Sequence, residues 1–103
     1  MGRVTAFVIA IAIAGFTLVF RSSDHAPPHF HVRKGHLWEI RVYIDASTEA
    51  AGLSYDYKFP KNMSKAFRGI SAGEEKELLK NVILHREALL LEWEQKVNRS
   101  GVI

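Results

Sequence analysis

The sequence contains no cysteine, so disulfide bonds and thiolate metal ligands are both excluded. It has no internal repeat, no low-complexity tract, no Walker loop and no glycine-rich dinucleotide-binding pattern. Repeat architectures and the nucleotide-binding folds that carry those motifs are therefore not indicated. A chain without cysteine fits a reducing compartment, and we expect a cytoplasmic protein.

Chain length limits the number of domains, and net charge bears on the possible partners. With 103 residues, the chain is large enough for one modest core, so we expect a single domain over residues 1–103. The formal net charge is +3. A basic excess of this size is compatible with RNA or DNA as a partner, but an excess this small is usually only an ordinary solvated surface.

The N-terminal residues 4–20 carry no charge before Arg21, and this length approaches the roughly 20 residues of a membrane helix. A membrane span or a secretory segment is therefore the alternative interpretation. However, large and small side chains alternate strictly through this stretch, the large ones being Phe7, Ile9, Ile11 and Ile13. This period of two favours a buried strand, turned at Ala14-Gly15 into a second strand over 16–21. We expect no membrane segment.

Two more strands, 29–33 and 37–45, show alternating apolar and polar residues around a loop at 34–36. A three-residue loop there pairs His31 with Glu39 and His29 with Arg41 on the polar face. A fifth alternating run, 53–59, ends at Pro60.

Helical signals follow the strands. Residues 62–68 predict a short helix, and a Ser71–Glu74 capping box opens a long helix over 72–98. Its apolar stripe contains Leu78, Val82, His85, Leu89 and Trp93. With residues 4–59 mostly in strands and hairpins, the fold class is α+β. We expect a mainly antiparallel sheet of four or five strands with one long C-terminal helix packed on one face.

The most unusual segment is Asp24-His25-Ala26-Pro27-Pro28-His29-Phe30-His31-Val32, which places three of the five histidines within seven residues. Pro27 and Pro28 predict a stiff elbow before a strand. In that strand, the two-residue period sends His29 and His31 to one face.

This segment, together with Leu84–Trp93, resembles a small prokaryotic family described as a domain of unknown function, over roughly residues 15–95. The family motif is (Asp/Glu)-His-x-Pro-Pro-His-x-His-Val. The resemblance implies a compact α+β domain in a bacterial protein without an established activity. It also implies a suspected toxin–antitoxin-type role beside a small protein encoded next to it.

Three functional interpretations stay open. In the first, the polar face binds or acts on nucleic acid without a cofactor, using His25, His29, His31, Glu39 and Arg41 as acid–base and charge-stabilising groups. The nucleic-acid backbone and bases would be held by Arg33, Lys34, Tyr43, Lys58, Lys61, Lys65 and Arg68.

In the second interpretation, His25, His29 and His31 ligate zinc or another divalent metal. In the third, the chain is an interaction module without catalysis. An exposed sheet edge could then pair with a second copy in a homodimer or with a small partner protein. The sequence does not decide whether the protein is an enzyme.

Overall fold

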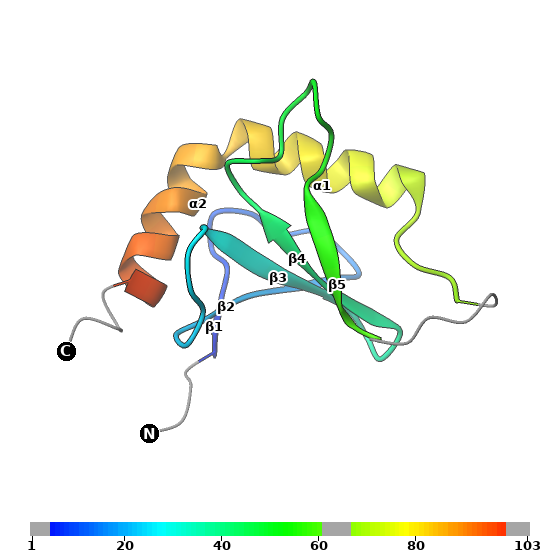
Figure 1. Ribbon diagram of the computed structural model, residues 1–103, viewed down its shortest axis with the longest axis horizontal. Helices are drawn as coiled ribbons and strands as arrows, with labels where there is room; N and C mark the ends of the chain where they lie inside the picture. The colour runs from blue at the N-terminus through cyan, green and yellow to red at the C-terminus, as the bar shows by residue number, and fades with distance from the viewer. Residues whose placement is uncertain (1–4, 61–66, 99–103) are drawn as a thin grey trace.

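The computed structural model describes residues 5–60 and 67–98. It contains five strands, β1 (Thr5–Phe7), β2 (Thr17–Arg21), β3 (His29–Lys34), β4 (Trp38–Tyr43) and β5 (Tyr55–Phe59). They are followed by helices α1 (Ala72–Leu84) and α2 (Arg86–Trp93) and by a π-helical turn, η1 (Glu94–Asn98). The strands form one antiparallel sheet in the order β1-β2-β3-β4-β5, and the helices lie across one side of it (Figure 1). The expected α+β class is confirmed.

The core lies between the helices and the apolar face of the sheet. Alternation along β3 and β4 buries Phe30 and Val32 on the same side as Ile40 and Val42. From the helices, the cluster receives Leu78, Val82, Leu89, Trp93 and Val97. Fully burying an aliphatic side chain contributes roughly 1.5–3 kcal/mol, so this shared cluster accounts for the attachment of the helices.

The hairpin of β3 and β4 has a different register from the predicted one. His31 lies opposite Arg41, and His29 lies opposite Tyr43. The loop begins at Gly35, whose φ of 52° lies in the left-handed region that glycine adopts without steric strain. Lys34 therefore stays in the strand and pairs with Trp38. Because the shift from the predicted pairs is two residues, every side chain keeps its predicted face.

The N-terminal strand is shorter than predicted. A hairpin does form with a turn at residues 14–15, but β1 ends at Phe7. The backbone N–H groups of Ile9 and Ala10 then donate to the carboxylate of Glu92 on α2, at 2.9 Å and 2.5 Å to the nearest oxygen. This contact draws the segment away from the sheet. Phe7 and Ile9, predicted to be buried, are 71% and 79% exposed.

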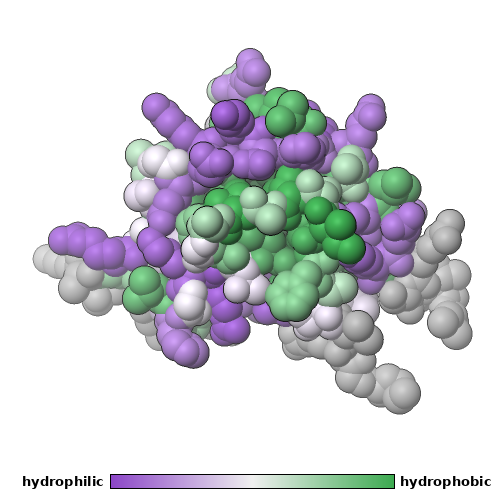
Figure 2. Space-filling model, turned by 180° about the vertical axis from the view of Figure 1, so that it is seen from behind, coloured by the Kyte–Doolittle hydropathy of each residue, from purple (hydrophilic) through white to green (hydrophobic). Residues whose placement is uncertain are grey.

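The segment after β1 passes behind the sheet in Figure 1. Figure 2 shows that side of the molecule, where apolar side chains gather across the centre of the surface. No helix in the described ranges is both long enough and apolar enough to span a bilayer.

The predicted C-terminal helix is interrupted at His85, which has a φ of −116° and ends α1. Figure 1 shows the chain bending there, so that both helices follow the sheet. Arg86 fixes the second helix to the loop after β4 by donating to the carbonyl groups of Ile44 and Ser47. The buried stripe is confirmed except at His85, which is half-buried at the bend. Of the predicted 62–68 helix, residues 61–66 lie outside the described residues, and residues 67–68 are not helical.

Replacing Ser71 by alanine should lower the free energy of unfolding by about 1 kcal/mol, because it removes the N-cap of α1. The predicted capping box is present: Glu74 N donates to Ser71 Oγ at 3.1 Å, and Ser71 N donates to Glu74 Oε1 at 2.9 Å. Urea denaturation measures the effect. The matched variant Ser71→Asp keeps an accepting oxygen and should retain most of the stability. Equal losses in both variants would contradict the capping role.

Candidate metal site

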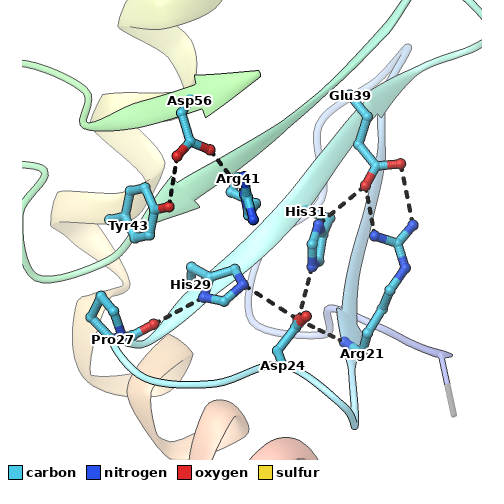
Figure 3. Close-up of polar contacts among 9 residues, drawn as sticks. All are labelled: Arg21, Asp24, Pro27, His29, His31, Glu39, Arg41, Tyr43 and Asp56. Carbon is cyan, nitrogen blue, oxygen red and sulfur yellow. Dashed lines mark hydrogen bonds and ion pairs between the residues drawn. The ribbon is translucent and has the colours of Figure 1, made fainter. Parts of the chain in front are cut away.

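The elbow between β2 and β3 folds Asp24 inward. Asp24 N donates to the carbonyl of Arg21 at 3.0 Å, and Arg21 N donates to Asp24 Oδ2 at 3.3 Å. This reciprocal pair makes a tight turn directly after β2. The chain then passes through Pro27 and Pro28 and enters β3 at His29. The carboxylate of Asp24 consequently faces the two histidines of β3 (Figure 3).

Both histidines point the same ring nitrogen at one carboxylate oxygen. His31 Nε2 lies 2.8 Å from Asp24 Oδ2, and His29 Nε2 lies 3.5 Å from the same atom. Asp24, His29 and His31 each offer a metal-ligand atom, and these atoms all lie within 4.8 Å of one another. The ring centroids are 5.2 Å apart at an interplanar angle of 72°. The three groups therefore surround one point between them.

The other ring nitrogen of each histidine faces an acceptor. His29 Nδ1 lies 2.9 Å from the carbonyl oxygen of Pro27. A carbonyl only accepts, so this nitrogen donates and the neutral ring keeps its lone pair on Nε2. His31 Nδ1 lies 3.1 Å from Glu39 Oε2, without the alignment of a hydrogen bond. Metal-bound histidines in proteins are commonly oriented in this way by a carbonyl or a carboxylate.

Glu39 is itself held in place. Its carboxylate accepts from the two terminal nitrogens of Arg21 at 2.6 Å and 3.2 Å, a bidentate pair. Arg33 Nε lies 3.7 Å from Glu39 Oε1. Burial alone would raise the pKa of the Glu39 carboxyl, but the hydrogen bond and charge of Arg21 outweigh it and lower that pKa. Glu39 is therefore an ionised support for His31.

The same opposing effects act on the pKa of the Asp24 carboxyl. Burial would raise its pKa, yet hydrogen bonds to His29 and His31 and their charges lower it well below its ordinary value. A carboxylate kept ionised beside imidazole nitrogens is a suitable ligand for a divalent cation.

The histidines are buried, with His31 1% exposed and His29 6% exposed. The elbow covers them from the polar side of the sheet, and the ring of His29 lies 5.3 Å from that of Trp93. Such side chains are inaccessible to a macromolecule's backbone but are suited to a small ion. The polar sheet face predicted from the sequence is therefore buried at these two residues.

The rim of the site is built from β4 and β5. Arg41 Nε donates to Asp56 Oδ1 at 2.9 Å, and the hydroxyl of Tyr43 donates to Asp56 Oδ2 at 2.9 Å. The hydrogen bond to Asp56 raises the pKa of Arg41, and burial followed by the same carboxylate raises the pKa of Tyr43. Arg41 thus lies beside the histidines with its charge partly balanced by Asp56.

Several predicted site residues are elsewhere. His25 is exposed and does not join the other two histidines; Asp24 takes its place. His85 is not part of this cluster. Lys34 pairs with Glu74 at 2.6 Å.

Among the predicted nucleic-acid contacts, Arg33 and Arg68 are exposed and Lys58 is half-buried, while Lys61 and Lys65 lie outside the described residues. Sequence reasoning missed Arg21, Asp24 and Asp56 as site residues. Two signals for them were present: the acidic first position of the histidine motif, and the alternation that puts Asp56 on the same face as Arg41.

Stability at low pH should depend on Glu39. Its folded-state pKa is lowered, so the stability it contributes is present above the unfolded pKa of about 4.3 and is lost as the pH falls through the folded value. The variant Glu39→Gln should therefore show a shallower loss of unfolding free energy between pH 6 and pH 3 in metal-free protein. Urea denaturation across that range measures it. Glu87→Gln, at an exposed position, controls for net charge; identical slopes in Glu39→Gln and wild type would contradict the assignment.

Comparison with known proteins agrees with the resemblance seen in the sequence. No curated protein and no solved structure shows significant similarity to the chain. Residues 15–94 match a protein family, and this stretch includes the elbow, all of β2 to β5 and the interrupted helix through Glu94. The chain therefore belongs to the family described as "Domain of unknown function (DUF4160)".

Proposed function

We infer that the protein binds a divalent transition-metal ion through Asp24, His29 and His31. The observation that carries this inference is the convergence of both Nε2 atoms on Asp24 Oδ2, while both Nδ1 atoms face acceptors. Ligands of a tetrahedral ion with bonds of 2.0–2.1 Å are separated by about 3.3 Å. The two distances to Asp24, 2.8 Å and 3.5 Å, lie on either side of that spacing, and the three ligand atoms all lie within 4.8 Å of one another.

Proton positions also support a cation at this point. If neutral His31 donates from Nε2 to Asp24, its Nδ1 lone pair faces the carboxylate of Glu39. If it carries the proton on Nδ1 instead, its Nε2 lone pair faces Asp24, as that of His29 does. Either tautomer places a lone pair against a carboxylate, which is unfavourable in a buried site. A cation satisfies the His31 atoms: either a second proton on the ring, which then faces a carboxylate with each nitrogen, or a metal ion bound at Nε2 with a proton on Nδ1.

The ligand set narrows the choice of metal. Two imidazoles and one carboxylate suit zinc, and the same set binds non-haem iron(II) in oxygenases. Three protein ligands also leave at least one coordination position for water or a substrate, as in catalytic rather than structural zinc sites. This arrangement is compatible with an enzyme.

The nucleic-acid and toxin–antitoxin interpretation stays a prediction of the sequence and of the family resemblance. Its support is the exposed side chain of Arg33 and the half-exposed side chain of Arg41 on the site face. Lys34 and Arg41, however, are paired with carboxylates, and the histidines are buried. A homodimer and a small partner protein also stay predictions.

The test is metal binding by protein purified without a histidine tag. After treatment with a chelator, titration with zinc against a competing indicator should show one ion per chain. Zinc at 100 times its dissociation constant should raise the free energy of unfolding by about 2.7 kcal/mol. Iron(II) and manganese(II) should be titrated in parallel. Substoichiometric binding of all three metals would overturn the proposal.

A further inference from the structure

We propose that the loaded site also binds a phosphate group, held jointly by the metal ion and by Arg41. This inference rests on the metal site proposed above and names the chemical class of its ligand. Arg41 is directly opposite His31 in the β3–β4 pair, and Tyr43 is directly opposite His29. Residues opposite each other on one face of an antiparallel pair have Cβ atoms about 4.5–5.5 Å apart. The guanidinium group therefore lies next to the metal ligands, on the same face (Figure 3).

The orientation of Arg41 leaves its binding groups available. Asp56 holds only the Nε atom, at 2.9 Å, and this contact fixes the plane of the guanidinium group. Within the described residues, the two terminal nitrogens of Arg41 make no hydrogen bond, and the side chain is 39% exposed. A guanidinium group with free terminal nitrogens and a fixed plane is suited to bidentate binding of a phosphate.

The charge balance favours an anion once the metal is present. Three carboxylates face three guanidinium groups around the site; they are Asp24, Glu39 and Asp56, and Arg21, Arg33 and Arg41. With neutral imidazoles these formal charges cancel, and Lys58 is near enough to lower the pKa of Glu39. A divalent ion adds two positive charges. The open coordination position then lies in a region of net positive charge.

The metal ion, Arg41 and Asp56 have distinct roles in binding the phosphate. The metal ion offers a coordination position to one phosphate oxygen, and Arg41 donates to the others. Asp56 is a positioning residue that orients Arg41, and its second oxygen accepts from Tyr43. His29 and His31 are buried, whereas Arg41 and Tyr43 are half-buried, so we expect a ligand to approach from the rim that Arg41 and Tyr43 form.

Calorimetric titration of inorganic phosphate into zinc-loaded and metal-free protein tests the proposal. Affinity should be at least about tenfold higher in the loaded protein. In zinc-loaded Arg41→Gln, phosphate affinity should fall roughly tenfold to hundredfold, the loss expected for charged hydrogen bonds. Arg41→Lys, which keeps the charge but loses the planar group, should recover only part of the affinity. Titration with a nucleoside monophosphate is compared with that of inorganic phosphate. A higher affinity for the nucleotide indicates that the bound phosphate group belongs to a nucleotide.

Lys80→Gln is the control for net charge, because it also removes one positive charge, but from an exposed side chain of α1, which packs on the apolar face of the sheet. It should change phosphate affinity less than about threefold. Zinc affinity is measured for every variant and should change little in Arg41→Gln, since Arg41 is not a ligand. Wild-type protein that binds none of zinc, iron(II) and manganese(II) stoichiometrically removes both proposals. Protein that holds zinc but binds phosphate equally well with Arg41→Gln overturns this inference alone.

Discussion

Replacing His31 by glutamine should abolish stoichiometric zinc binding, weakening it more than a hundredfold. Zinc contributes about 10–16 kcal/mol in small zinc domains, so one of three protein ligands accounts for at least about 3 kcal/mol. Water can replace His31 less easily than the other ligands, because the His31 side chain is 1% exposed and lies between Asp24 and Glu39. Competition against a chromophoric chelator measures the loss.

The controls come from the remaining histidines. His25→Gln alters the neighbouring motif position, where the side chain is exposed, and His36→Gln alters the exposed hairpin loop. Both variants should bind zinc as the wild type does. Far-ultraviolet circular dichroism of metal-free His31→Gln separates a lost ligand from a lost fold. Full zinc affinity in folded His31→Gln, or loss of zinc in His25→Gln, would contradict the assignment of ligands.

Arg21→Met should lower the free energy of unfolding by about 3–5 kcal/mol, because it leaves a buried carboxylate without its partner. The side chains of Arg21 and Glu39 are 14% and 5% exposed, and the two groups form a bidentate pair. The substitution keeps most of the side-chain volume, so the effect reports charge rather than packing. Urea denaturation of metal-free protein gives the magnitude.

A double-mutant cycle makes this prediction specific. Combining Arg21→Met with Glu39→Gln removes both charges, and the pair should be less destabilised than the sum of the single variants. Lys34→Met supplies a comparison at the more exposed Lys34–Glu74 pair, where we expect a loss below about 1 kcal/mol. Additive losses in the cycle, or equal losses in Arg21→Met and Lys34→Met, would show that Arg21 does not support Glu39.

Much of the sheet could be predicted from alternation. The period of two assigned Phe30 and Val32 to the core and His31 to the opposite face, and an error of two residues in register left those faces unchanged. The exact partners depended on where the loop began. That was decided by the left-handed conformation of Gly35, which the sequence only permits.

Contacts between distant parts of the chain could not be predicted. The alternation after Phe7 indicated a long strand, but Glu92 takes the backbone N–H groups of Ile9 and Ala10 from 83 and 82 residues away. Likewise, helix periodicity continues through His85, where packing of both halves on the sheet bends the chain. Tertiary contacts outweighed local patterns at both places.

The candidate site was located by its motif but not by its ligands. Adjacent residues Asp24 and His25 both had suitable side chains, and only the turn closed by Arg21 and Asp24 determines which one faces inward. Asp56 was likewise placed on a polar face, while its pairing with Arg41 depended on the β4–β5 register. The sequence motif therefore indicated where along the chain the site lies. The geometry of the turn determines which residues form it.

X-ray absorption spectroscopy of the zinc-loaded protein tests the central claim most directly, because it reports the atoms bound to the ion. We expect two imidazole nitrogens and carboxylate or water oxygens at 2.0–2.2 Å from the zinc ion. In His29→Gln, loaded at a zinc concentration above its weakened dissociation constant, we expect one imidazole to be lost, and in His25→Gln no change. A spectrum with three imidazoles that loses one in His25→Gln, or a fully hydrated ion, would contradict a site made of Asp24, His29 and His31.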